Sequence, residues 1–148
     1  MGRSVAGVLL KGDTVFVARR VPGGEMGGRW EFPGGKVEEG ESDQEALVRE
    51  FLEEFEADIR VLEPLGETSF LHRGQTRQLA AWWVELLPGT RLVLHEHVEL
   101  RWMSTADLAG LDFADSDRKL IDLVRDLSNR MQGSPADTRS AGRNGLTG

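Results

Sequence analysis

The sequence predicts a single domain of the α/β class, and three observations support this prediction. Short apolar and β-branched runs, typical of strands, recur along the chain, for example at residues 4–10 and 14–18. Two stretches, at 43–55 and 117–130, place apolar residues at helical spacing. The chain has 148 residues, 39% of them hydrophobic and 29% charged, which is typical of one soluble domain with a sizeable core.

Predicted strands precede and follow the helix predicted at 43–55. Residues 4–10 and 14–18 predict the two strands of a hairpin, because a Lys-Gly-Asp turn signal separates them. After the first helix, an extended segment at 58–72 is broken at 64–66 by Pro-Leu-Gly, and a strand at 76–87 follows a second turn signal.

Two charged residues near the first hairpin are candidates for substrate contact. Arg20 ends the second strand, where it is either a solvated terminus or a guanidinium that grips phosphate. Residues 21–29 hold four glycines and a proline, so a mobile loop is expected there. Glu31 follows, between two aromatic residues. An acid is unusual in a buried strand, so we expect Glu31 to face a site.

The stretch from Gly34 to Glu54, GGKVEEGESDQEALVREFLEE, carries the strongest functional signal. Ser42 with Glu45 forms a capping-box pattern, which predicts a helix that starts near Asp43 and ends at 55–57. Glu41 precedes this helix and is expected to lie close to its acids in space.

Three glutamates of this helix predict a metal site. Glu50, Glu53 and Glu54 are spaced i, i+3 and i+4, so they share one face and repel one another. A bound cation would remove that repulsion, and carboxylate oxygens suit Mg²⁺. The alternative is a solvated acidic face.

The segment His-Glu-His at 95–97 invites an interpretation as a zinc site. No third nitrogen or sulfur ligand is at hand in the sequence, so zinc is not expected. Glu96 or Glu99 is instead a candidate to add a carboxylate to the helix acids, as metal ligand or general base.

Composition excludes several classes of function. The formal net charge of −7 disfavours duplex nucleic acid, although metal ions could bridge an acidic protein to polyphosphate. The absence of cysteine excludes disulfides and zinc-thiolate sites. The sequence has no apolar run of membrane-spanning length and no signal peptide, so a cytoplasmic protein without membrane contact is expected. From residue 131 onward the chain is poor in bulky apolar residues, which predicts a disordered tail at 131–148 behind a domain at 1–130.

The stretch around the first helix resembles the Nudix box, G-x5-E-x7-R-E-U-x-E-E-x-G-U, in which U is a bulky aliphatic residue. Seven positions fill the pattern at the right spacing: Gly35, Glu41, Arg49, Glu50, Phe51, Glu53 and Glu54. Glu56 replaces the usual glycine and Ala57 the last aliphatic residue, so an altered helix end is expected. Outside the box, residues 18–42 and 95–121 resemble MutT-type nucleoside triphosphate pyrophosphohydrolases, including the CTP pyrophosphohydrolase branch.

The resemblance implies the fold, a mixed β-sheet between helices in an α/β/α sandwich. It also implies the reaction, hydrolysis of a nucleoside triphosphate at the α–β phosphoanhydride to a monophosphate and pyrophosphate. The cofactor would be Mg²⁺, with Mn²⁺ as an alternative, and the protein would act as a monomer or a homodimer on a small nucleotide.

The resemblance further assigns roles to residues. The implied metal ligands are the Gly34 carbonyl, Glu50, Glu53, Glu54 and Glu96. Glu53 is the first choice for activating water and Glu96 the second. Arg49 orients the carboxylates, held by Glu41.

Substrate contacts come from residues outside the box. Arg20 is expected to bind phosphate, and Glu31 and Asp117 to bind substrate. A carboxylate at Asp117 could accept from the amine of cytosine or from the N–H edge of 8-oxoguanine. The alternative for Asp117 is a cap of the last helix.

Two other functions compete with this interpretation. One is a Nudix hydrolase for another diphosphate, such as ADP-ribose. The other is a non-catalytic Nudix-fold module that binds nucleotides. A binding module has no need of mutually repelling carboxylates, so the intact acids of the helix disfavour it.

Overall fold

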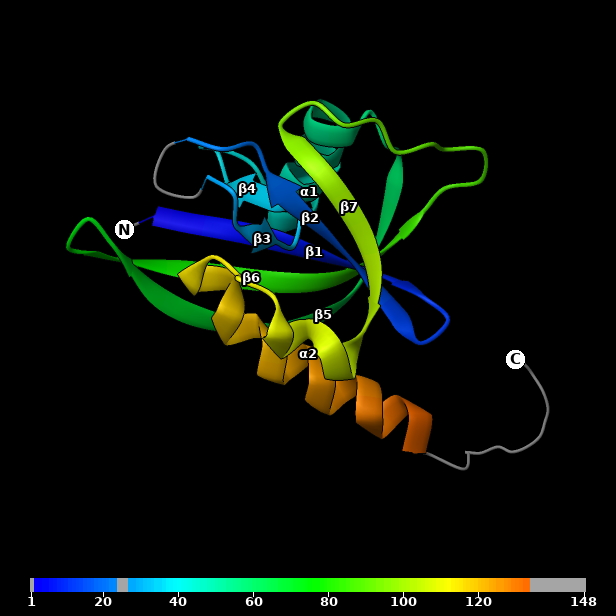
Figure 1. Ribbon diagram of the computed structural model, residues 1–148. Coiled ribbons are helices and arrows are strands. Elements are labelled where there is room, and N and C mark those ends of the chain that lie inside the picture. Colours follow the sequence, from blue (N-terminus) through cyan, green and yellow to red (C-terminus); the bar gives the residue numbers. More distant parts are fainter. Residues whose placement is uncertain (1, 24–26, 134–148) are drawn as a thin grey trace.

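The computed structural model describes residues 2–23 and 27–133 (Figure 1). Its elements, in chain order, are β1 (Gly2–Lys11), β2 (Thr14–Arg20), β3 (Trp30–Glu31), β4 (Gly34–Lys36), α1 (Asp43–Phe55), β5 (Ile59–His72), β6 (Gln75–Leu86), β7 (His97–Ser104), the 3₁₀ helix η1 (Thr105–Gly110) and α2 (Asp115–Gly133). The predicted hairpin, first helix and long strands are therefore all present.

The strands form one mixed sheet. Its main order is β3-β2-β1-β6-β5, with β4 paired to β1 and β7 paired to β2. β1 and β6 run parallel, whereas the other pairs are antiparallel. The expected break in the extended segment after α1 appears as register shifts around Pro64 in β5.

The sheet separates two hydrophobic cores, one under each helix (Figure 1). α1 buries Leu47, Phe51 and Phe55 against one face of the sheet. Residues 120, 121 and 124 of α2 pack into the core on the other face. The predicted α/β/α arrangement is confirmed. In this arrangement the acidic side of α1 faces β4 and the first residue of β7, His97.

The ends of α1 follow from its sequence. Ser42 is the N-cap, and its hydroxyl accepts from the Glu45 amide while the Glu45 side chain accepts from the Ser42 amide. At the other end Glu56 takes the left-handed conformation (φ 52°) that glycine usually supplies there. The expected alteration of the helix end is therefore absent, because Glu56 itself takes the conformation that a glycine would.

Parts of the loop and of the C-terminal tail expected from the sequence lie outside the residues that the structure describes. Residues 24–26 of the expected loop lie outside the described residues. Residues 131–133, assigned to the tail from the sequence, belong to α2, and the remainder of the expected tail lies outside the described residues. None of the helices described is both long and apolar enough to cross a membrane.

Candidate functional site

Gly34 and Gly35 lie in β4 and let this strand approach both β1 and α1 closely. A Cβ added at Gly34 would overlap the carbonyl oxygen of Val5 on β1. A Cβ added at Gly35 would lie 2.5 Å from the carboxyl group of Glu50. Both glycines are therefore required by close approach, the first to backbone and the second to an acid of α1.

Arg49 joins the predicted acids into one network. Its Nε donates to Glu41 at 2.7 Å and its Nη2 donates to the second Glu41 oxygen at 3.0 Å. Its Nη1 donates to Glu50 at 3.0 Å and to Glu53 at 3.3 Å, and Nη2 also donates to the Lys36 carbonyl. The paired guanidinium lowers the pKa of Glu41 to about 2. Glu41 is thus close to the helix acids, as expected.

The three helix acids do not meet at one point. Glu53 turns outward, with 60% of its side chain exposed, and contacts Arg49. Glu54 is buried, and burial raises its pKa to about 10, with further contributions from a hydrogen bond to Glu50 and from the charge of Glu31. Glu50 and Glu54 therefore lie on the side of α1 that faces the rest of the site, whereas Glu53 lies at its exposed edge, and Arg49 contacts both Glu50 and Glu53.

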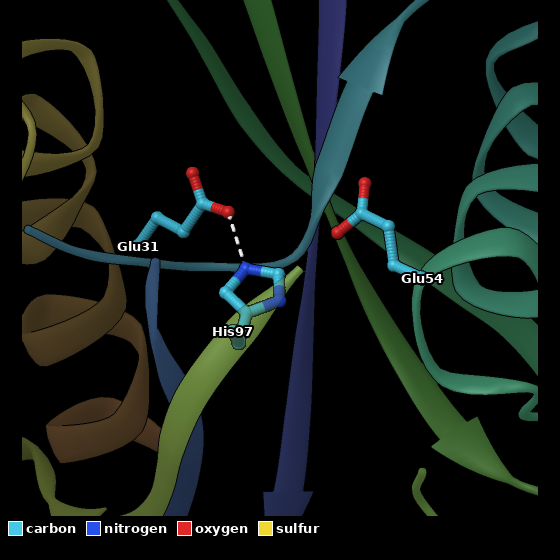
Figure 2. A group of neighbouring side chains, drawn as sticks. All are labelled: Glu31, Glu54 and His97. Atoms are coloured by element: carbon cyan, nitrogen blue, oxygen red, sulfur yellow. Dashed lines mark hydrogen bonds and ion pairs between the residues drawn. The ribbon is translucent and has the colours of Figure 1, made fainter. Parts of the chain in front are cut away.

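Glu54 instead meets two residues from other elements (Figure 2). Ligand atoms of Glu31, Glu54 and His97 lie within 4.8 Å of one another, and we call these three residues the histidine–glutamate cluster. His97 Nε2 lies 2.7 Å from Glu31 Oε2, and the imidazole stacks on Phe55 with ring centroids 5.0 Å apart. Glu31 faces a site, as expected.

The cluster fits a divalent cation. Glu54 Oε1 and His97 Nδ1 are buried without a hydrogen-bond partner. A buried carboxylate without a partner is unfavourable, and a cation would satisfy it. The sequence interpretation considered His97 within the His-Glu-His segment and set it aside, because only the fold brings the start of β7 to Glu54 of α1.

The predicted substrate residues line a single cleft. Its volume is about 260 Å³, and Arg20, Glu31, Gly34 and Asp117 are among its lining residues. Arg20 donates to Glu31 at 3.2 Å. Arg20, Glu31 and Asp117, which the sequence analysis proposed as substrate-binding residues, therefore lie in one cleft beside Gly34 of β4.

Asp117 is not the N-cap of α2. It lies in the first turn of α2, and its buried carboxyl accepts from the backbone amide of Phe32 at 2.8 Å. Burial, followed by the charge of Glu31, raises the pKa of Asp117 to about 8. At neutral pH this carboxyl group therefore retains a proton and can donate as well as accept a hydrogen bond.

The two candidate acids beyond α1 differ in position. Glu96 lies 3.5 Å from Arg20, with 57% of its side chain exposed, and its charge contributes to the raised pKa of Glu54. Glu99 pairs with Arg19 and Arg101, so its carboxylate is engaged by basic residues of β2 and β7. Of the two, Glu96 is the one close to the cluster.

The two histidines of the His-Glu-His segment do not act together. His95 lies 2.6 Å from Glu56 at the end of α1, whereas the buried His97 belongs to the histidine–glutamate cluster. A metal site that uses both histidines is therefore excluded by the fold.

The site thus combines three chemical capabilities. Carboxylates of α1 offer oxygen ligands to a hard cation. Arg20 offers a guanidinium for phosphate. Asp117 offers a buried hydrogen-bonding group at the same cleft. A metal-bound polyphosphate with a polar ring attached matches this combination.

Comparison with known proteins gives a consistent result. The family model described as NUDIX domain matches residues 1–124. A Mycobacterium tuberculosis protein named "Putative 8-oxo-dGTP diphosphatase 2" is 40% identical over 136 residues, which cover 90% of this chain and 92% of that protein. The Escherichia coli "CTP pyrophosphohydrolase" is 35% identical over 118 residues, covering 80% of this chain and 87% of that protein.

Solved structures agree in fold. The solution structure of the E. coli ORF135 protein superposes with a TM-score of 0.74 at 32% identity, covering 93% of this chain and 95% of that one. The crystal structure of a MutT protein from Methanosarcina mazei gives a TM-score of 0.72 at 22% identity, covering 85% of this chain and 94% of that one. At that identity, the second likeness concerns the fold alone.

Proposed function

The chain belongs to the Nudix family, and from that premise we propose that it hydrolyses nucleoside triphosphates at the α–β phosphoanhydride. The products are a nucleoside monophosphate and pyrophosphate, and Mg²⁺ is the cofactor, with Mn²⁺ as a substitute. Two relatives named for hydrolysis of 8-oxo-dGTP and CTP, which together span most of the chain, support this proposal.

One observation carries the proposal: Arg20, Asp117 and the two glycines of β4 line the same cleft. Glu50 of α1 lies against Gly35. A triphosphate in this cleft would place its phosphates near the acids of α1 and its base near Asp117. The guanidinium of Arg20 and the buried carboxyl of Asp117 line the same cleft, which therefore matches a nucleotide better than a bare phosphate.

The proposed ligands for Mg²⁺ are Glu50, Glu53, Glu54 and Glu96, with the Gly34 carbonyl as a further donor. Their oxygen atoms suit this ion, and the unpartnered oxygen of Glu54 is satisfied by it. When bound, Mg²⁺ neutralises charge that develops on the leaving pyrophosphate and lowers the pKa of water.

The protein's own residues have distinct roles in this mechanism. Glu53 is exposed and can orient water or take its proton, and Glu96 is the second candidate. Arg49 and Glu41 position Glu50 and Glu53 through the hydrogen bonds described above. Arg20 exchanges its contacts with Glu31 and Glu96 for substrate phosphate.

Asp117 and Glu31 are proposed to read the base. The raised pKa of Asp117 gives it an O–H as well as an acceptor oxygen at neutral pH. This pair of groups can match the edge of 8-oxoguanine or of cytosine, so (deoxy)cytidine triphosphates and 8-oxo-dGTP are the proposed substrates. Removal of the oxidised nucleotide would sanitise the pool of DNA precursors.

A panel of nucleotides tests the proposal. The protein is incubated with Mg²⁺ and dCTP, CTP, 8-oxo-dGTP, dGTP or ADP-ribose, and the products are separated and identified. We expect pyrophosphate and a monophosphate from 8-oxo-dGTP, a cytidine nucleotide, or both. Turnover of ADP-ribose alone would overturn the substrate class, and orthophosphate as the direct product would overturn the cleavage position.

The same panel tests the role of Asp117. Asp117→Asn keeps the acceptor for the Phe32 amide but fixes the donor as an amide. We expect its ratio of kcat/KM values between 8-oxo-dGTP and dCTP to change more than its best kcat. An unchanged ratio would mean that Asp117 does not contact the base.

A further inference from the structure

His97 is a buried residue beside the cleft to which the proposed mechanism gives no role. Its side chain is fully buried at the start of β7, and its imidazole stacks on Phe55 of α1. A phenylalanine ring could make the same stacking contact, so packing alone does not explain a histidine at this position. What the imidazole adds is a hydrogen bond: Nε2 lies 2.7 Å from Glu31 Oε2, and the two side chains point toward each other in Figure 2.

A β-bulge brings this imidazole to the site. β7 pairs with β2 in regular register as far as Arg19 and Glu99, after which Arg20 lies opposite His97 instead of Val98. Opposed residues of an antiparallel pair lie on the same face of the sheet, so the bulge places His97 on the face that carries Arg20. Bulges next to functional sites commonly redirect a side chain in this way.

Arg20 and His97 share one oxygen of Glu31. Arg20 Nη1 donates to Oε2 at 3.2 Å, and His97 Nε2 lies 2.7 Å from the same atom. An ionised carboxylate only accepts, so Nε2 is the donor. The other ring nitrogen, Nδ1, is buried and has no hydrogen-bond partner among the residues described, so the polar contact of this imidazole is with Glu31. Oε1 of Glu31 carries neither of these two bonds, and Glu31 lines the cleft.

The two donors differ in their freedom to move. The side chain of Arg20 is 33% exposed, whereas that of His97 is fully buried. An exposed guanidinium can exchange a protein carboxylate for a substrate phosphate, but a close-packed ring cannot leave without opening a cavity. Once Arg20 turns to phosphate, the contact from His97 still holds Glu31. The charge of Glu31 also contributes to the raised pKa of Asp117, so a displaced Glu31 would alter both residues proposed to read the base.

We propose that His97 is a positioning residue, which holds Glu31 in place to read the base while Arg20 binds substrate phosphate. His97 contacts Glu31 rather than the nucleotide, so its effect on binding passes through that residue. The inference rests on the proposed function, because Glu31 reads the base only in that function. Its consequence is a change in affinity for the nucleotide rather than in the chemical step.

Binding of the product nucleotides tests the proposal without turnover. Dissociation constants for dCMP and 8-oxo-dGMP are measured calorimetrically, without metal, for the wild type, His97→Phe and His97→Gln. His97→Phe keeps a ring against Phe55 and removes the donor, whereas His97→Gln supplies an amide N–H instead. We expect His97→Phe to weaken the tighter of the two complexes about tenfold and His97→Gln to stay within about threefold of the wild type. Equal loss in both variants, or wild-type affinity in His97→Phe, would overturn the proposal.

A double-mutant cycle separates positioning from general damage. In a Glu31→Ala background His97→Phe should change the dissociation constant by less than about twofold, because the residue through which it acts is gone. An undiminished effect in that background would show that His97 acts by another route and would sink the proposal. His95→Gln is the matched control and should bind as the wild type does, since His95 contacts Glu56 outside the cluster.

Imidazole NMR on the wild type keeps the proposal testable if His97→Phe does not fold. The Nε2–H of His97 is buried and therefore protected from exchange with water. We expect its signal to persist when dCMP or 8-oxo-dGMP binds, because His97 stays on Glu31 while Arg20 moves to phosphate. Loss of the signal on binding would contradict the proposal.

Steady-state kinetics supply the corresponding split between KM and kcat. In His97→Phe we expect KM to rise about tenfold and kcat to stay within about threefold, as for a loss of uniform binding. A fall in kcat at unchanged KM would contradict a positioning role. Absence of turnover across the nucleotide panel would overturn the proposed function, whereas the metal-free binding and NMR results would still decide the role of His97.

Discussion

At the scale of single residues, consecutive acids of α1 hold their carboxyl groups in different surroundings. Glu53 has 60% of its side chain exposed and contacts Arg49, whereas Glu54 is buried beside Glu31 and His97. An exposed carboxylate is accessible to water and can accept a proton from it, whereas a buried one gains from a cation. This difference supports the proposal that Glu53, besides its place among the proposed metal ligands, activates water, whereas Glu54 serves as a ligand alone.

Glu53→Gln tests the role of water activation. We expect kcat to fall by about 10²-fold or more, since the amide cannot take a proton. Stability should change by less than about 0.5 kcal/mol, because the side chain is exposed. Steady-state kinetics and the thermal midpoint are the measurements, with Glu63→Gln, an exposed residue of β5, as the control. Full activity in Glu53→Gln would transfer the role to Glu96.

Asp117→Asn tests the protonation of the buried carboxyl. Its pKa is about 8 in the folded protein against a reference of 3.8. Between these values the folded state keeps a proton that the unfolded state has lost, so this group lowers stability as pH rises from about 4 to 8. Urea unfolding of metal-free protein at pH 5 and 8 should show the variant gaining stability relative to the wild type at the higher pH. A difference independent of pH would contradict the raised pKa.

At the scale of elements, two short features flank α1, the glycine pair of β4 before it and the cap at its end. Gly34 and Gly35 pair with β1, and Gly35 lies directly against Glu50. Glu56 closes the helix in the left-handed conformation and reaches His95. Each feature makes a distinct prediction.

The two glycines should respond differently to alanine. Gly34→Ala places a methyl group on the backbone of Val5, which cannot move aside, so we expect a loss of about 1–3 kcal/mol of stability or more. Gly35→Ala meets only the end of the Glu50 side chain, so the protein should fold while Mg²⁺ binding and kcat decline. Urea unfolding and metal titration measure these effects, and equal destabilisation by both changes would contradict the distinction.

Glu56→Gly tests the strain at the helix end. A left-handed conformation costs a non-glycine residue about 1–2 kcal/mol, which glycine avoids. The contact with His95 is exposed and offsets part of this. We therefore expect Glu56→Gly to add about 1 kcal/mol of stability in a His95→Gln background and less in the wild type. Destabilisation in both backgrounds would show that the cap is unstrained.

At the scale of the whole molecule, the sheet and α1 bring together acidic residues that repel one another. Glu31, Glu50 and Glu54 come from β3 and α1, and their interaction is one cause of the raised pKa of Glu54. A ligand that binds only the folded state stabilises it in proportion to the logarithm of its concentration. Folding and metal binding should therefore be linked.

Mg²⁺ should raise the thermal midpoint of the wild type. At a concentration of 100 times its dissociation constant the gain is about 2.7 kcal/mol. Glu54→Gln keeps the shape of the side chain but cannot lose a proton to become a carboxylate ligand, so its gain with Mg²⁺ should be clearly smaller. Thermal unfolding with Mg²⁺ and with a chelator measures both gains, and an equal gain in the variant would exclude Glu54 as a ligand.

Most secondary-structure elements and part of the contacts around α1 could be predicted from the sequence. Apolar and β-branched runs predicted the strands, apolar residues at helical spacing predicted both helices, and the Ser42–Glu45 pattern predicted the start of α1. The resemblance to the Nudix box implied the contact of Arg49 with Glu41. These features depend on local periodicity and on contacts between residues close in the chain, so they can be read from one segment at a time.

Only the tertiary structure decided the rest. In the folded protein Glu54 is buried and Glu53 is exposed, and His97 and Glu31 lie beside α1. Asp117, a possible helix cap from the sequence, is a buried acceptor for the Phe32 amide. The physical reason is that burial and long-range contact depend on how separate elements pack. The side of a strand or helix that faces another element, and the residues that it meets there, are set by the assembled sheet rather than by the order of the chain.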